Sequence, residues 1–355
     1  MGDMIKGNIA VAEAAVRAGI EVYAGYPITP STEVMEYLSD RLPALGRTFI
    51  QAESELAAIN MVMGVSACGR RVLTASSGPG ISLKQEGISY MAQMNYPAVI
   101  LNVVRWGNGL GSLDGAQTDY LRETRGGGNG DYRNIVLCPA TVQESVDLMY
   151  EAFDISERYR CIVEIMTDSG LGQMMEPCDM PPFREIKKCG WGLDGTYKVR
   201  RPDFLGRNIP AESETYMQKV RAMRENEQRW VSTDVDDADY VFVAFGMCGR
   251  VMTGLIGELR EKGYKVGLIR PISAWPFPEK AFEELKAKNP NVKGFITVET
   301  NGEGQMAEDV AIYTRKHGLG AAPIYALAYA CGVPKDNVVT ADFEKILAGE
   351  IKEVF

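Results

Sequence analysis

Short apolar segments alternate with longer amphipathic segments over the first 170 residues of this 355-residue chain. Apolar runs rich in β-branched residues predict strands, and apolar residues at helical spacing predict helices between them. Strands that are separated by crossover helices predict a parallel sheet covered on both faces, which is an α/β fold. The expected strands are residues 21–24, 48–50, 72–75, 98–104, 135–137 and 162–167, and the expected helices are residues 9–17, 31–38, 54–66, 81–94 and 142–156.

The same alternation returns near residue 239, after a stretch rich in proline, glycine and charge. That stretch is long for a loop inside one domain. We therefore expect a first α/β domain over residues 1–171, an extended linker over residues 172–235 and a second α/β domain over residues 236–355. Strands are expected at 240–245, 265–269 and 294–298, with helices at 249–262, 278–288 and 304–316, and one helix near 212–229 in the linker.

Composition excludes several classes of function. The formal charge is −9 and no cluster of lysine and arginine is present, which argues against nucleic acid and against an anionic membrane surface. No segment is long and apolar enough to span a bilayer. The seven cysteines include no Cys-x-x-Cys pair, so no local zinc or iron–sulfur ligand set is expected and the thiols suit the cytoplasm. His317 is the only histidine, which argues against histidine-based triads and metal sites.

Four loops are expected at the carboxyl ends of the strands, where ligands gather in parallel sheets. They are residues 25–30, 76–80, 105–111 and 126–130. The serine- and glycine-rich loop at 76–80 suits close approach of a ligand to the backbone, but it is equally typical of a tight strand-to-helix turn. The glycines at 107–111 have the wrong spacing for a dinucleotide fingerprint.

Three polar residues near these loops are candidates for chemistry. Glu55 enters the first turn of an apolar helix, where a carboxyl can share a proton with a bound nitrogen base, or simply favour the helix N-terminus. Glu53 is a competing carboxylate on another face. Thr29 lies in a loop that two prolines constrain. Arg105 ends a strand and can hold a carboxylate by paired hydrogen bonds, or form an ordinary interface salt bridge.

Several motifs together resemble the alpha subunit of the 2-oxoacid:ferredoxin oxidoreductases and cover nearly the whole chain. Residues 25–32 read GYPITPST, 51–58 read QAESELAA and 74–80 read TASSGPG, while 270–278 read RPISAWPFP and 299–306 read ETNGEGQM. Four further segments are similar to the branched-chain, or 2-oxoisovalerate, type of that subunit. They are VVRWGNGLG at 103–111, QTDY at 117–120, GGGNGDYR at 126–133 and GQMMEP at 172–177.

The resemblance implies thiamine diphosphate chemistry on a pyrimidine-binding domain, followed by a transketolase C-terminal-like domain. By this resemblance, Glu55 is the catalytic carboxyl that hydrogen-bonds the ring nitrogen N1′ of the aminopyrimidine. Thr29 would lie near the reacting centre as a catalytic and substrate-binding hydroxyl, and Arg105 would bind the substrate carboxylate. The cofactor pocket would include Pro27, Ile28, Ser76, Ser77 and Gly78 in addition to Glu55.

The resemblance also implies partner subunits. The family's diphosphate motif, Gly-Asp-Gly with a later asparagine, is absent from this chain. A beta subunit would therefore hold the diphosphate and its Mg²⁺, and iron–sulfur clusters would lie on partner subunits. A gamma subunit and a ferredoxin-like subunit would complete the complex, with ferredoxin as electron acceptor and coenzyme A as co-substrate. The expected product is the acyl-CoA of a branched-chain 2-oxoacid, with 2-oxoglutarate and pyruvate as open alternatives.

Two other kinds of protein remain possible from the residues alone. One is a transketolase-like or decarboxylating subunit without electron transfer. The other is a non-catalytic assembly module, against which the joint presence of Pro27, Thr29, Glu55 and Arg105 argues. A nicotinamide-dependent dehydrogenase is a third and weaker reading, since the fingerprint is missing.

Overall fold

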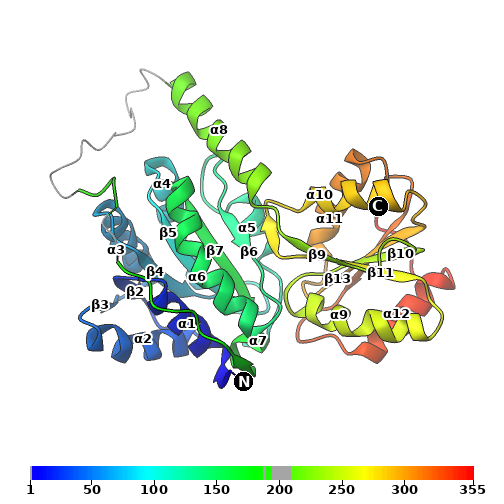
Figure 1. Ribbon diagram of the computed structural model, residues 1–355, viewed down its shortest axis with the longest axis horizontal. Helices are drawn as coiled ribbons and strands as arrows, with labels where there is room; N and C mark the ends of the chain where they lie inside the picture. Colours follow the sequence, from blue (N-terminus) through cyan, green and yellow to red (C-terminus); the bar gives the residue numbers. More distant parts are fainter. Residues whose placement is uncertain (1, 187–188, 194–208) are drawn as a thin grey trace.

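A seven-stranded sheet organises the first half of the computed structural model, which describes residues 2–186, 189–193 and 209–355 (Figure 1). The strand order is β12-β6-β7-β5-β4-β2-β3. All neighbours pair in parallel except β12, which is antiparallel to β6. The strands are β2 (Val22–Gly25), β3 (Thr48–Gln51), β4 (Val72–Ser76), β5 (Ala98–Val104), β6 (Ile135–Leu137), β7 (Ile162–Asp168) and β12 (Ser273–Trp275).

Helices cover both faces of this sheet. On one face, α1 (Gly7–Arg17), α2 (Thr32–Ala44) and α6 (Val142–Tyr159) pack on alternate strand residues such as Leu73 and Val99. On the other face, α3 (Glu55–Ala67) and α4 (Pro79–Met94) pack on Val72 and Ile100. Because side chains alternate along a strand, Thr74 and Ser76 point to the same side as Val72, toward α3 and α4. The predicted parallel sheet with two covered faces is confirmed.

A five-stranded sheet organises the second half, with the order β14-β13-β10-β11-β9. Its strands are parallel except β9, which is antiparallel to β11. The strands are β9 (Trp230–Thr233), β10 (Tyr240–Val243), β11 (Val266–Pro271), β13 (Gly294–Glu299) and β14 (Ile324–Ala328), and the helices are α9 (Gly246–Glu261), α10 (Glu279–Lys288), α11 (Gln305–Lys316) and α12 (Asp336–Leu347). The sequence predicted neither β14 nor α12.

The segment predicted as an extended linker contains regular structure at both of its ends. Near its start, β8 (Met175–Cys178) follows the short helix α7 (Ser169–Gln173) and pairs with the N-terminal strand β1 (Asp3–Lys6). Near its end, α8 (Ile209–Asn226) leads into β9 of the second sheet. The helix expected near 212–229 is therefore present and begins three residues earlier.

The two halves are tied together by strand pairing and by side chains. Strand β12 comes from the second half of the chain, yet it extends the first sheet beside β6. The Arg270 guanidinium donates two hydrogen bonds of 2.9 and 3.0 Å to the Glu144 carboxylate. The Tyr120 hydroxyl, on the short helix α5 (Tyr120–Arg125), donates to Asp309 at 2.7 Å. In the described part of the chain, no helix is long and apolar enough to cross a membrane.

Candidate active site

Three loops meet at the carboxyl edge of the first sheet, after β2, β4 and β5. Arg105, the residue after β5, holds them together. Its Nη1 donates to the Thr29 carbonyl oxygen at 2.9 Å, and its Nη2 donates to the Leu110 carbonyl oxygen at 2.8 Å. The guanidinium also lies against Gly78, whose φ of +44° belongs to the region that glycine favours. The structure thus brings the loops at 25–30, 76–80 and 105–111 together, as the sequence predicted.

Glu55 is a carboxyl beside this junction, since its side chain lies against Gly80 of the second loop. It is the first residue of α3, after Ser54, whose hydroxyl accepts a hydrogen bond from the Ala57 amide at 3.1 Å and caps the helix. Only 5% of Glu55 is exposed, and no described residue donates a hydrogen bond to its carboxyl. Glu53, two residues earlier, is exposed. Of the two carboxylates that the sequence offered, only Glu55 is withdrawn from solvent.

A glycine in α4 makes room for the Glu55 side chain. A Cβ at Gly80 would lie 2.6 Å from Glu55 Oε1 and 2.3 Å from Ser76 Oγ, which is closer than real Cβ contacts come. The hydroxyls of Ser76 and Ser77 are buried and have no hydrogen-bond partner among the described residues. Buried polar groups are normally paired. A carboxyl beside the unpaired Ser76 hydroxyl therefore suits a ligand with polar ring atoms of its own.

The remaining predicted residues lie on the same edge. Thr29 is exposed, while Pro27 and Ile28 are half-buried. The Ile28 carbonyl oxygen accepts a 2.8 Å hydrogen bond from the Ser31 hydroxyl, which closes the loop ahead of α2. The Thr29 hydroxyl therefore borders open space beside Arg105, at the rim of the site rather than inside it.

The glycine-rich loop at 126–130 is not at the carboxyl edge, and the prediction for it is wrong. A Cβ at Gly127 would lie 2.6 Å from the Gln85 side chain, and one at Gly128 would lie 2.6 Å from the Gln85 carbonyl oxygen. The loop therefore runs along the middle of α4. The reason is the parallel direction of β6, which begins at the opposite edge of the sheet, so the chain must cross α4 to reach it.

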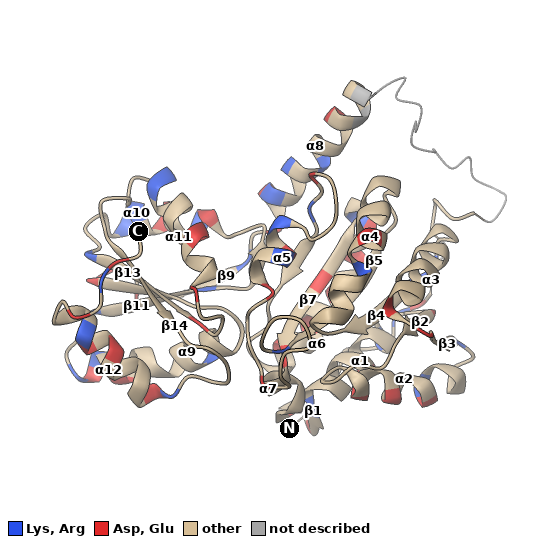
Figure 2. Cartoon of the chain, turned by 180° about the vertical axis from the view of Figure 1, so that it is seen from behind, with Lys and Arg blue, Asp and Glu red and all other residues tan. Residues whose placement is uncertain are grey.

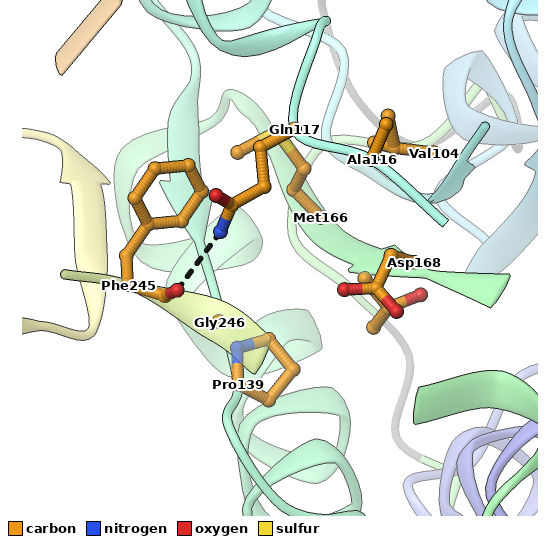
Figure 3. Close-up of a pocket in the computed structure, with 9 residues that line it drawn as sticks. Val104, Ala116, Gln117, Pro139, Met166, Asp168, Phe245 and Gly246 are labelled. Carbon is orange, nitrogen blue, oxygen red and sulfur yellow. Dashed lines mark hydrogen bonds between the residues drawn. The ribbon is translucent and has the colours of Figure 1, made fainter. Parts of the chain in front are cut away.

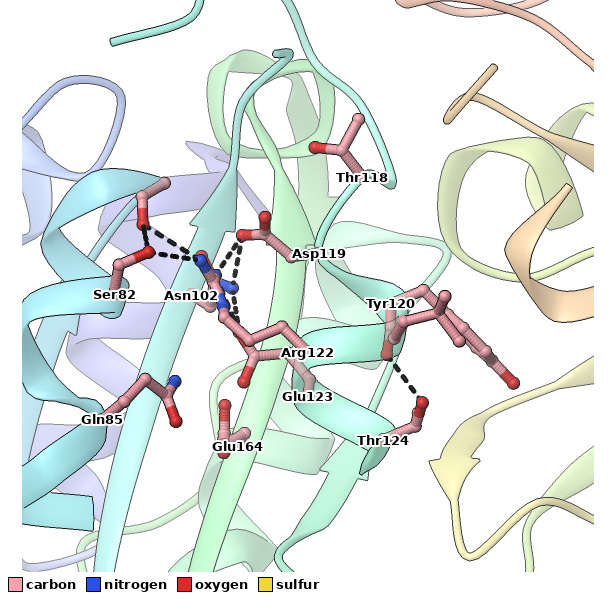
Figure 4. Close-up of polar contacts among 12 residues, drawn as sticks. Ser82, Gln85, Asn102, Thr118, Asp119, Tyr120, Arg122, Glu123, Thr124 and Glu164 are labelled. Carbon is pink, nitrogen blue, oxygen red and sulfur yellow. Dashed lines mark hydrogen bonds and ion pairs between the residues drawn. The ribbon is translucent and has the colours of Figure 1, made fainter. Parts of the chain in front are cut away.

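A buried cluster of polar side chains, which we name the acid cluster, was not predicted (Figure 4). The Asn102 amide donates to Asp119 at 3.0 Å and to Glu123 at 2.9 Å, and Arg122 ion-pairs with both carboxylates. Burial raises the pKa of Asp119 and raises that of Glu164 well above its usual range. The signal in the sequence was a polar residue inside each of two apolar strands, at 102 and 164. The acid cluster consists of Asn102, Asp119, Arg122, Glu123 and Glu164.

A small cavity lies between the two halves of the chain, at the ends of β5 and β7 (Figure 3). Its volume is about 10 Å³, room for about one water molecule. The Gln117 amide spans it by donating to the Phe245 carbonyl oxygen at 2.8 Å. Burial raises the pKa of Asp168, on the cavity wall, to about 6. The QTDY segment thus joins the two halves, since Gln117 also pairs with the backbone of Thr300.

Charged residues are unevenly distributed along the helices (Figure 2). Helix α3 carries one charged residue, Glu55, and its exposed side presents Leu56 to solvent. Its neighbour α4 exposes Leu83 and Tyr90. Within the described ranges, no three His, Cys, Asp or Glu side chains are placed to hold a metal ion. The described residues therefore offer polar partners for a ring nitrogen, the Glu55 carboxyl and the Ser76 hydroxyl, and no carboxylate cluster for a metal ion.

Comparison with known protein families defines the class. A family described as pyruvate flavodoxin/ferredoxin oxidoreductase, thiamine diphosphate-binding, matches residues 13–236. The core domain II of pyruvate:ferredoxin oxidoreductase matches residues 238–332. The chain belongs to this family and is a subunit of a 2-oxoacid:ferredoxin oxidoreductase, a multi-subunit enzyme. The resemblance seen in the sequence is confirmed at this level.

Two of the similar proteins are subunits of enzymes that are named after different 2-oxoacids. The chain is 45% identical over 314 residues to ketoisovalerate oxidoreductase subunit VorB of Methanothermobacter marburgensis, with 86% of this chain and 88% of that one covered. It is 33% identical over 350 residues to 2-oxoglutarate synthase subunit KorA of Methanocaldococcus jannaschii, with 89% and 95% covered.

Two solved structures share the fold. One is the 2-oxoglutarate:ferredoxin oxidoreductase from Magnetococcus marinus with 2-oxoglutarate, coenzyme A and succinyl-CoA bound, at a TM-score of 0.81 and 24% identity. The match covers 97% of this chain and 65% of that chain, so this chain spans about two thirds of its length. The other is a split-gene transketolase, an inactive beta4 tetramer, at a TM-score of 0.61 and 14% identity, covering 98% and 99%. The predicted fold class, a thiamine-diphosphate-binding domain followed by a transketolase-like α/β domain, is confirmed.

Proposed function

We propose that this chain is the alpha subunit of its enzyme and supplies the aminopyrimidine half of the thiamine diphosphate site. In this proposal the Glu55 carboxyl moves a proton to and from a ring nitrogen of the bound cofactor. The observation that carries the proposal is a buried carboxyl that no described residue hydrogen-bonds, next to the unpaired hydroxyl of Ser76. General acid–base help of this kind contributes about 10²–10⁴-fold to a rate.

The other edge residues take supporting roles in the proposal. When bound, the thiazolium of thiamine diphosphate supplies the electron sink for decarboxylation. Pro27, Ile28 and Gly78 border the place where the ring would bind. Arg105 retains an unpaired, buried Nε, and each of its terminal nitrogens carries a second N–H, so it has donors left for a substrate carboxylate. Thr29 presents its hydroxyl at the rim beside Arg105, where a 2-oxoacid would enter.

We further propose that partner subunits complete the site. A beta subunit would hold the diphosphate and Mg²⁺, and partner subunits of the gamma and ferredoxin-like kinds would carry iron–sulfur clusters toward ferredoxin. Helix α3, apolar on all sides, supports this proposal because such helices are normally buried. Its exposed Leu56 and the neighbouring Leu83 offer an apolar surface next to Glu55. All seven cysteines are free thiols, in keeping with a cytoplasmic enzyme.

For the substrate, we propose a branched-chain 2-oxoacid such as 2-oxoisovalerate, converted with coenzyme A to the acyl-CoA and CO₂. The higher identity to the VorB relative, 45% against 33% for the KorA relative, favours it. The KorA relative makes 2-oxoglutarate the second candidate. The purified complex should show its highest kcat/KM for 2-oxoisovalerate among that acid, 2-oxoglutarate and pyruvate. A preference for 2-oxoglutarate would reverse this assignment without changing the reaction class.

The role of Glu55 can be tested by comparing its substitution with the same substitution at the neighbouring Glu53. Glu55→Gln in the assembled complex should lower kcat for 2-oxoacid-dependent, coenzyme A-dependent dye reduction by about 10²-fold or more, because the amide cannot exchange a proton. Glu53→Gln, at the exposed carboxylate two residues away, should leave kcat unchanged. Wild-type turnover by Glu55→Gln would remove this side chain from catalysis. A complex that assembles but is inactive even as wild type would favour the non-catalytic module instead.

A further inference from the structure

Lys84, in the second turn of α4, is a buried cation that the proposed chemistry has not used. None of its surface is exposed. Among the described residues, its Nζ makes one hydrogen bond, to the Thr74 hydroxyl at 3.1 Å. An ammonium group has three donors and loses much of its hydration on burial. One neutral hydroxyl does not compensate for that loss, so a negative charge nearby is needed.

The packing of α4 against α3 brings the Glu55 carboxyl near Lys84. Lys84 follows Gly80 by four residues, so both lie on the same face of α4, about 5–6 Å apart. Gly80 is in contact with Glu55 Oε1 and Ser76 Oγ. Thr74, which holds Lys84, lies two residues before Ser76 on the same face of β4. The Lys84 side chain therefore leaves α4 one helical turn after the glycine that contacts the Glu55 carboxyl, on the face of α4 that packs on β4.

We propose, on the basis of the function proposed above, that Lys84 is a positioning residue for Glu55, whose carboxylate form its buried positive charge stabilises. The stabilised carboxylate releases its proton more readily to a bound nitrogen base. In this transfer the O–H bond at Glu55 Oε breaks and an N–H bond forms on the base, and no electrons are exchanged. Without the cation, this proton transfer is less favourable.

The charged surroundings of Lys84 agree with this geometry. Burial lowers the pKa of the Lys84 ammonium to about 8, while the Glu55 carboxylate raises it. The ammonium is thus charged at neutral pH and loses its charge above about pH 8. Glu55 comes from α3, and β4 contributes the hydroxyls of Thr74 and Ser76. The carboxylates of the acid cluster lie further along the same face of the sheet. Asp119 and Glu123 are paired with Arg122 and Asn102, and Glu164 accepts a hydrogen bond from Asn134.

Removal of the charge in the assembled complex gives the first test. Lys84→Met keeps the length of the side chain and should lower kcat about tenfold at pH 7, the equivalent of one pKa unit, with KM for the 2-oxoacid unchanged. The wild-type kcat should decline above about pH 8, and Lys84→Met should lack that decline. Lys262→Met, at an exposed lysine after α9, is the matched control and should behave as wild type.

A double-mutant cycle on the full chain without cofactor gives the second test. Lys84→Met should raise the midpoint of thermal unfolding by about 2 °C or more, because the cost of burying the ammonium exceeds its attraction to Glu55, as the lowered pKa of Lys84 indicates. Glu55→Gln should lower the midpoint when Lys84 is present and should not do so in Lys84→Met, since the two charges then no longer interact. The pKa of Lys84 in the folded chain lies below its usual 10.5. The free energy of unfolding should therefore rise between about pH 8 and 10.5 in the wild type, and Lys84→Met should lose this rise.

Two results would overturn the proposal. One is a wild-type kcat and an unaltered pH profile in Lys84→Met. The other is an equal effect of Glu55→Gln on stability with and without Lys84. Should Lys84→Met fail to fold, Thr74→Val removes the hydroxyl that holds the ammonium, and it should lower kcat in the same direction. Full turnover by Glu55→Gln alone would refute the function proposed above, while the cycle would still report whether the two charges interact.

Discussion

The terminal nitrogens of Arg105 donate hydrogen bonds to two carbonyl oxygens of the loops. The resemblance in the sequence predicts that the same side chain binds a substrate carboxylate. Its terminal nitrogens each donate one hydrogen bond, to the carbonyl oxygens of Thr29 and Leu110, and the Nε–H together with one N–H on each terminal nitrogen remains for another partner. A guanidinium can do both tasks, because it has five N–H donors in a fixed plane. Its structural role is visible in the fold, and its role toward substrate stays a prediction.

Substitution of Arg105 separates these two roles. Arg105→Gln should raise KM for the 2-oxoacid about tenfold or more, because the carboxylate loses a charged partner. It should also lower the free energy of unfolding by about 1–3 kcal/mol, since the carbonyl oxygens of Thr29 and Leu110 lose a charged donor. Steady-state kinetics and denaturant unfolding measure the two effects, with the exposed Arg221→Gln as control. A stability loss with an unchanged KM would leave Arg105 a structural residue only.

Elements of the sheet were predictable where the pattern was local. The six parallel strands of the first sheet follow from apolar periodicity, and so do the helices between them except the short α5, which was not predicted. The short strand β12 did not, because three residues carry too little pattern and their partner in β6 lies more than 130 residues away. Strand β8 was hidden for the same reason, as its pairing with β1 joins the beginning of the chain to the segment expected to be a linker.

At the scale of packed helices, Gly80 determines how closely α4 approaches Glu55. Gly80→Ala should lower kcat at least tenfold and weaken thiamine diphosphate binding, because the new Cβ would occupy the place of Glu55 Oε1 and Ser76 Oγ. Turnover assays and calorimetric titration of the cofactor measure these effects. Gly257→Ala in α9 is the control, where a Cβ meets nothing within 4 Å. That change should leave kcat unaltered and stabilise the helix by about 0.5–1 kcal/mol. Normal activity in Gly80→Ala would mean that the Glu55 pocket tolerates repacking.

At the scale of the whole molecule, exposed leucines lie on α3 and α4, the two helices that enclose Glu55. Leu83 on α4 is 52% exposed, near Leu56 on α3. Apolar surface of this kind next to a functional site is typical of protein interfaces. The second half of the chain is fixed to the first by β12 and by the bonds of Arg270 and Tyr120. We expect a partner subunit to cover the exposed leucines of α3 and α4 instead.

A charge on that surface should prevent assembly. Leu83→Glu should abolish co-purification of partner subunits, because the carboxylate would be buried unpaired in the interface. The isolated chain should keep its unfolding midpoint, since Leu83 is exposed there. Leu347, on α12 in the second half, is 42% exposed and provides the control. Leu347→Glu should leave assembly unchanged. Size-exclusion chromatography of co-expressed subunits measures both, and an intact complex with Leu83→Glu would place the partner elsewhere.

The sequence alone determined the α/β class, the parallel first sheet, the family and the loops that meet at the carboxyl edge. These follow from periodicity, from proline and glycine at turns, and from motifs, all of which are local properties of the chain. Only the tertiary structure decided that Glu55 rather than Glu53 is buried, that the 126–130 loop crosses α4, and that Lys84 lies near Glu55. Burial and charge pairing depend on which segments the fold packs against each other, and no local pattern records that.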